Sequence, residues 1–139
     1  MKITNLSLDV IIEDSFKRIR ELRRLKGGEY ADPRADDPLA NFRRSGANLK
    51  LPIEIIWQVY ADKHWGAISQ YIRDVQDNIE RERLEGIEGR VDDLLTYLLL
   101  FKAMVVERSE NNKERIPFGE LVERLSPSNS PLFLHTQED

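Results

Sequence analysis

The side chains best suited to chemistry are carboxylates near the start of one predicted helix. Four of them lie within nine residues, directly before an apolar run: Glu85, Glu88, Asp92 and Asp93. At about 100° per residue the first three share an arc of roughly 60°, whereas Asp93 lies about 100° from Asp92. Like charges this close repel one another unless a cation lies between them. Oxygen-only ligands of this kind suit Mg²⁺ or Mn²⁺.

A second polar strip lies on the preceding long helical pattern. Glu54, Gln58 and Asp62 are spaced i, i+4, i+8, and two facing strips would form a carboxylate cage. Asp62 interrupts a helix between Tyr60 and His64, where it gains no capping benefit, so we expect a cation or a donor to face it. The alternative for Glu85 and Glu88 is structural, because acidic residues near a helix start complement its dipole and cap free N–H groups.

Candidate phosphate contacts follow the segment Asp36-Asp37-Pro38. Arg43 and Arg44 lie on a short predicted helix, where arginine can fork onto phosphate oxygens, and Tyr30 or Phe42 could stack on a base. The alternative is a solvated cationic face with Phe42 in the core, which we favour for Phe42. Lys63 is suited either to a phosphate or to a salt bridge. We expect His64 in a core or an interface, and His135 lies in the tail.

Helical periodicity accounts for the elements that must position these residues. Apolar residues recur at helical spacing from Asp9 to Lys26, from Pro52 to about Asp77 and from Glu88 to Arg108. Gly27-Gly28 is expected to end the first helix. A short helix is expected from Leu39 to Arg44, begun by Asp37-Pro38 and closed by Ser45-Gly46. Another is expected over 117–125, followed by an extended arm over 126–139.

These patterns predict an all-α bundle of three long helices plus short ones, in a single domain over residues 1–125. The third long helix is apolar over more than the ~100° that one neighbouring layer would cover. We therefore expect a homodimer, or a dimer of dimers, to complete the bundle.

Composition excludes several classes of protein. The 139 residues contain no cysteine and two histidines, which excludes a disulfide framework and argues against a histidine-rich zinc site. A net charge of −4 argues against a protein that grips duplex nucleic acid. No apolar stretch reaches the ~18 residues of a membrane span, and the acidic N-terminal region does not resemble a signal peptide. The chain is thus expected to be soluble and cytoplasmic. Phosphate-loop, dinucleotide-binding, zincin and nucleophile-elbow motifs do not occur in it.

Several strings together resemble the nucleotide modification associated domain family of small phage and bacterial proteins, which looks like a distant relative of the MazG-like all-α nucleoside triphosphate pyrophosphatases. The strings are Lys26 to Tyr30, Asp37 to Arg43, Asp62-Lys63, Glu85 to Glu88 and Asp93 to Tyr97. The resemblance covers roughly Lys26 to Met104. The chain departs from the family at Gly27, Glu29 and Ala31, where Asn, Asp and Gly are usual. Val59 stands where an arginine is usual, and Gly66-Ala67 stands where Arg-Leu is usual. The E-E-x-x-E string of MazG-like enzymes is missing.

The resemblance implies a Mg²⁺-dependent (or Mn²⁺-dependent) pyrophosphohydrolase of phage nucleotide metabolism, which cuts a (deoxy)nucleoside triphosphate to the monophosphate and pyrophosphate. Asp62 and Glu88 would be catalytic, and the metal ligands would come from Glu54, Asp62, Glu85, Glu88, Asp92 and Asp93. The resemblance favours Asp93, whereas the helical wheel favours Asp92 as the partner of Glu88. Substrate contacts would come from Tyr30, Asn41, Arg43, Arg44 and Lys63. The alternatives are a non-catalytic phage protein that sequesters a nucleotide or cyclic nucleotide signal and a helical adaptor with no small-molecule site; a phage protein would act in the host cytoplasm.

Overall fold

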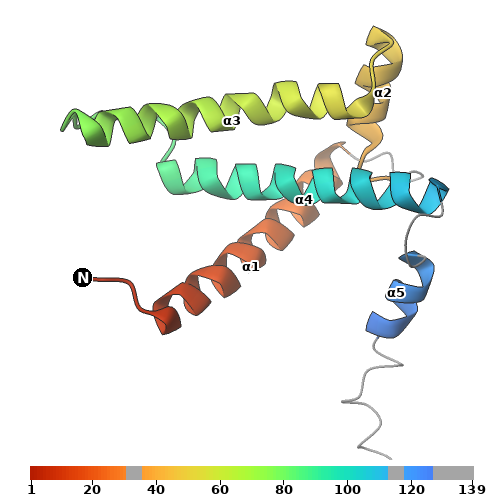
Figure 1. The fold of residues 1–139 in the computed structure, drawn as a ribbon, viewed down its shortest axis with the longest axis horizontal. Helices are drawn as coiled ribbons and strands as arrows, with labels where there is room; N and C mark the ends of the chain where they lie inside the picture. Colours follow the sequence, from red (N-terminus) through yellow and green to blue (C-terminus); the bar gives the residue numbers. More distant parts are fainter. Residues whose placement is uncertain (31–35, 113–117, 127–139) are drawn as a thin grey trace, which may run out of the picture. The chain divides into compact units, whose positions relative to one another are not determined.

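Five helices make up the computed structural model, which describes residues 1–30, 36–112 and 118–126 (Figure 1). They are α1 (Asn5–Tyr30), α2 (Ala40–Leu49), α3 (Ile53–Gln76), α4 (Ile87–Asn112) and α5 (Phe118–Leu125). No strand occurs among these residues, which confirms the all-α class. No helix of the described part is both long and apolar enough to cross a membrane.

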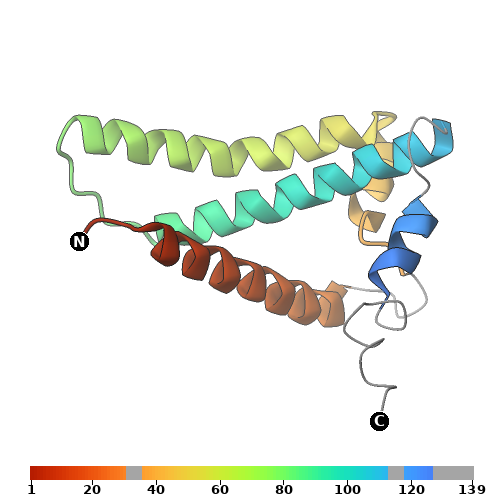
Figure 2. The same cartoon turned by 60° about the horizontal axis from the view of Figure 1, so that its bottom comes forward.

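The chain divides into two compact units, Met1–Leu100 and Phe101–Asp139, with the boundary inside α4. The single domain expected over 1–125 stays a prediction, and the expected arm lies outside the described residues except for Ser126. Within the first unit, α3 and the first half of α4 run antiparallel, as both views show (Figure 2).

α3 begins and ends within a residue of its predicted bounds, whereas α1 begins four residues before Asp9 and α4 ends four residues after Arg108. The two helix ends assigned to glycine are wrong. α1 continues through Gly27-Gly28 to Tyr30, and α2 continues through Ser45-Gly46 to Leu49. A glycine inside a helix costs only about 1 kcal/mol, so flanking helix formers can carry the helix through it. The C-cap of α2 is Lys50, whose φ of 56° is left-handed, and the Leu51 N–H closes the turn by donating to the Gly46 carbonyl at 2.9 Å.

The α2–α3 corner holds most of the buried apolar side chains of the first unit. Leu39 and Phe42 from the α2 side and Ile56 and Ala61 from α3 are all at least nine-tenths buried. Asp37 accepts the Leu39 N–H at 3.0 Å in the turn before α2. The N-cap of α2 is Leu39, so the prediction that Asp37 is the N-cap and that the helix starts at Leu39 is wrong. The expectation that Phe42 belongs to the core is confirmed.

A buried carboxylate fixes the loop that follows α3. Asp74 is 2% exposed and accepts hydrogen bonds from Arg81 at 2.8 and 3.0 Å, from Arg83 at 2.6 Å and from Gln70 at 2.9 Å. The Arg83 guanidinium also lies over the Tyr71 ring, 5.2 Å from its centroid. The hydrogen bonds from Arg81 and then Gln70 lower the pKa of Asp74 to about 2.

Half-exposed apolar residues on α4 agree with the surplus apolar face expected from the sequence. They are Val91, Leu95, Leu98 and Leu99. The homodimer inferred from that surplus stays a prediction.

Two glycines give a matched test of the α2–α3 corner. A Cβ at Gly46 would lie 2.8 Å from the Leu51 carbonyl oxygen, whereas nothing lies within 4 Å of one at Gly66. We expect Gly46→Ala to lower stability by roughly 1–3 kcal/mol because backbone must move. Gly66→Ala should raise it by about 0.5–1 kcal/mol through helix propensity. Urea denaturation of both variants checks this, and a stabilising Gly46→Ala would contradict the packing.

Replacing Asp74 tests the anchored loop. We expect Asp74→Asn to lower the melting temperature by several degrees at pH 7, because Arg81 and Arg83 lose their shared charged acceptor. A depressed pKa contributes stability above the unfolded value of 3.8, and this is lost as the pH falls toward about 2. The difference in melting temperature between wild type and Asp74→Asn should therefore shrink as the pH falls from 3.8 toward about 2. The exposed Asp62→Asn is the control, and equal melting temperatures for Asp74→Asn and wild type would refute the anchor.

Candidate functional site

A group of aromatic and titratable side chains meets where α2, α3 and the first half of α4 come together. We call Phe42, Tyr60, His64, Asp93 and Tyr97 the His64 cluster. The Phe42 ring lies edge-on to Tyr60 at 6.1 Å and to Tyr97 at 6.3 Å between centroids. The His64 and Tyr97 rings are 5.2 Å apart. These contacts join three helices at one point.

A hydrogen bond between α3 and α4 fixes the position of this cluster along both helices. The Trp57 indole N–H donates to the Tyr97 backbone carbonyl. His64 is two turns after Trp57 on α3, and Asp93 is one turn before Tyr97 on α4. In the antiparallel pair of helices, His64 therefore lies beside Asp93.

His64 is a buried imidazole next to a carboxylate. It is 9% exposed, and its Nδ1 lies 3.6 Å from Asp93 Oδ2, with no hydrogen-bond partner among the described residues. Burial lowers the pKa of His64, and Arg90 and Lys63 act in the same direction, while Asp93 and Glu85 oppose them. The ring is therefore neutral at pH 7 and can accept or donate a proton.

Tyr97 supplies a second polar group to the same place. Burial, followed by the charge of Asp93 and by Tyr60, raises the pKa of Tyr97. Its phenol therefore stays protonated at neutral pH and remains a hydrogen-bond donor.

Among the predicted carboxylates of α4, Asp93 is the one that faces α3. Glu88 and Asp92 are rotated from Asp93 by about 140° and 100° on the helix, and Glu88 is exposed. Glu85 is also exposed and forms an ion pair with Arg90 at 3.0 Å. The position favoured by the family resemblance, rather than the one favoured by the helical wheel, thus reaches His64.

The structure does not bring the predicted carboxylates of α3 to the same place. Asp62 is exposed and lies about 160° around the helix from His64, so its carboxylate keeps its water and the desolvation expected for it does not arise. Glu54 is half-buried near the start of α3. No group of three or more acidic or histidine side chains with metal-site geometry occurs in residues 1–30, 36–112 and 118–126.

The predicted phosphate contacts fall into separate local interactions. Arg43 Nε donates to Asp37 Oδ2 at 2.8 Å, which lowers the pKa of Asp37. Arg44 donates to Asn41 Oδ1 at 3.0 Å and lies about 160° around α2 from Phe42. Lys63 is exposed, one turn after Tyr60. The Tyr30 side chain lies outside the described residues.

Tyr60 and Tyr97 are the cluster members that the sequence does not single out as functional. Each tyrosine is four residues, or about one helical turn, from a polar residue: Tyr60 from His64, and Tyr97 from Asp93. A tyrosine four residues from a histidine or a carboxylate on a predicted buried face is the signal that points to them.

Comparison with known proteins adds no relative. No protein-family model matches the chain, and no curated protein or solved structure is found to be similar to it.

The titration of His64 tests the site's electrostatics. We expect its NMR-monitored pKa to lie below 6.5, because burial disfavours the imidazolium. Asp93→Asn should lower that pKa further, since the carboxylate is the main group that raises it. Asp92→Asn, on another face of α4, should change it much less. A His64 pKa above 6.5, or one indifferent to Asp93→Asn, would contradict the geometry.

Proposed function

We propose that this chain binds a nucleotide at the exposed side of the His64 cluster and holds it without hydrolysis. The observation that carries this proposal is the Tyr60 ring, which is 50% exposed while its neighbour Phe42 is buried against it. Because the Phe42 contact already restricts the Tyr60 ring, little conformational entropy is lost when a nucleobase stacks on its exposed face.

Lys63 supplies the complementary charge. It is exposed one turn after Tyr60, and its ammonium is near enough to His64 to lower the imidazole pKa. A phosphate is attracted to such a point charge without fixed bidentate geometry. A ligand that is aromatic at one end and anionic at the other, a nucleotide or cyclic nucleotide, therefore fits this surface.

The placement of the acidic residues favours binding over hydrolysis. Glu85 is engaged with Arg90, Asp93 is beside His64, and Asp62 is on the far side of α3. Because these carboxylates point in different directions, a bound phosphate would not meet a shared metal in this arrangement. By the resemblance, such a protein would sequester a nucleotide signal in the host cytoplasm of a phage infection.

A second candidate is the Mg²⁺-dependent (deoxy)nucleoside triphosphate pyrophosphohydrolase. It is favoured by one observation, that Asp93 and Tyr97 face α3 at the positions that match the family string. A metal held by Asp93 with Glu54, Asp62, Glu85, Glu88 or Asp92 would lower the pKa of attacking water. Neutral His64 would then be placed to take up a proton.

Thermal shift separates the two functions. We expect one or more nucleotides from a panel of canonical, modified and cyclic forms to raise the melting temperature equally with Mg²⁺ and with EDTA. At a hundredfold excess over Kd the gain is about 2.7 kcal/mol. Tyr60→Leu and Lys63→Gln should each lower the affinity for that nucleotide at least tenfold, whereas the exposed Lys102→Gln should leave it unchanged. Stabilisation that requires Mg²⁺ would favour the hydrolase, and no stabilisation by any nucleotide would refute both.

Chromatography of the same mixtures decides about catalysis. Under the binding proposal the nucleotide is recovered intact. Release of monophosphate and pyrophosphate, lost in Asp93→Asn but kept in the exposed Glu82→Gln, would overturn the non-catalytic proposal in favour of the hydrolase.

A further inference from the structure

α1 carries its charges in two separate halves. Its first twelve residues, 5–16, include Asp9, Glu13 and Asp14 and no basic residue, whereas residues 17–26 include six basic residues and one acidic residue, Glu21. The helix dipole favours acids in the first turn and bases in the last turn only. Because Asp9 to Arg20 lie in the middle turns, the dipole does not explain this segregation.

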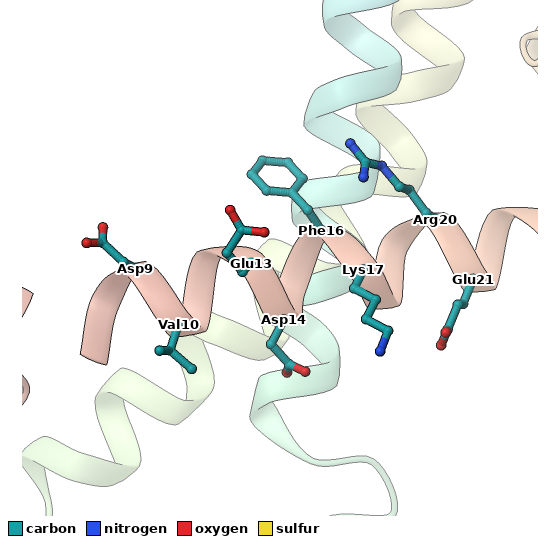
Figure 3. A pocket seen from close by; sticks show the side chains of 8 residues that line it. All are labelled: Asp9, Val10, Glu13, Asp14, Phe16, Lys17, Arg20 and Glu21. Carbon is teal, nitrogen blue, oxygen red and sulfur yellow. The ribbon is translucent and has the colours of Figure 1, made fainter. Parts of the chain in front are cut away.

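Four residues of α1, three of them charged, form a line along one side of the helix. Asp9, Glu13, Phe16 and Arg20, spaced 4, 3 and 4 residues apart, lie within roughly 60° of arc, and we call them the α1 row. Figure 3 shows Glu13, Phe16 and Arg20 pointing to the same side, and Val10, Asp14, Lys17 and Glu21 to the other.

The α1 row has charged groups without an ion-pair partner among the described residues, and apolar surface lies beside them. Asp14 is paired with Arg18 at 2.8 Å, but among the described residues neither Glu13 nor Arg20 has an ion-pair partner. Phe16 in the row and Ile12 next to it are 44% and 43% exposed, while Ile19 is buried. The row therefore combines unpaired charge of both signs with an uncovered apolar centre.

When two copies of α1 run antiparallel, the acidic residues of one copy lie opposite the basic residues of the other. Read from one end it is acid, acid, aromatic, base. With a two-fold axis at Phe16, Glu13 lies three residues from the axis and Arg20 lies four, so Glu13 of one copy is level with Arg20 of the other to within about 1.5 Å of helix rise. Asp9 is likewise level with Arg23 of the second copy. In a parallel pair, acidic halves would face each other and repel.

We propose that α1 is a self-association surface, and that it pairs antiparallel with α1 of a second copy of this chain through Asp9, Glu13, Phe16 and Arg20. A polyanion such as RNA is disfavoured as the occupant because the acidic half would repel it. In an isologous pair, which is the arrangement of most homodimers, the Glu13–Arg20 and Asp9–Arg23 ion pairs each form twice.

Charge reversal tests this pairing in the full-length chain. Sedimentation equilibrium should show a dimer that weakens as salt screens the ion pairs. Glu13→Lys or Arg20→Glu alone should weaken the dimer by roughly tenfold or more, because like charges then face each other. The double variant E13K/R20E should restore it, since the pairs return with reversed sign. Glu82→Lys, the same charge change in an exposed loop, is the control.

Disulfide trapping tests the orientation independently. The chain has no cysteine, so Glu13→Cys and Arg20→Cys each introduce a single thiol. After mixing and oxidation, the cross-link between the two different variants should predominate over the Glu13→Cys homodimer. A monomer at every concentration, failure of the double reversal to restore the dimer, or predominance of the Glu13→Cys homodimer would each overturn the proposal. Circular dichroism of each variant checks that it folds.

Discussion

The burial of one neutral imidazole is the constraint on which the first unit depends. His64 lies between α3 and α4 with the Tyr97 ring on one side and the Asp93 carboxylate at 3.6 Å. An imidazolium there would lose much of its water, and the nearby Asp93 carboxylate offsets only part of that cost, so burial favours the uncharged ring and lowers the pKa of His64. The aromatic contacts of Phe42, which reach both α3 and α4, enclose the same point from α2.

Much of this architecture can be predicted from the sequence because it depends on local periodicity. The apolar stripe after Pro52 predicts α3 to within a residue at each end, and the patterns of α4 and α5 predict their existence and starts. The ends assigned to glycine are wrong for a physical reason. Gly46 is a helix residue that lets the Leu51 carbonyl approach, and a sequence pattern does not distinguish a glycine that ends a helix from one that a neighbour requires to be small.

The site is less predictable because it depends on how each helix is rotated against its neighbours. Asp92 and Asp93 are equivalent by type, and the contacts of Tyr97 with His64 and Trp57 turn Asp93 toward α3. Asp62 interrupts an apolar pattern without being buried, since α3 has one side that the described chain leaves uncovered. Arg43, typical of a phosphate contact by composition, is held by Asp37 six residues earlier.

Nucleotide binding at the Tyr60 and Lys63 surface is the central claim, and NMR mapping of the binding site tests it most directly. Titration with the nucleotide that most raises the melting temperature should shift the backbone and ring signals of Tyr60, Lys63, His64 and Tyr97 in a saturable way. Signals of exposed α1 residues should move little. Shifts centred elsewhere, or none at saturating nucleotide, would contradict the account.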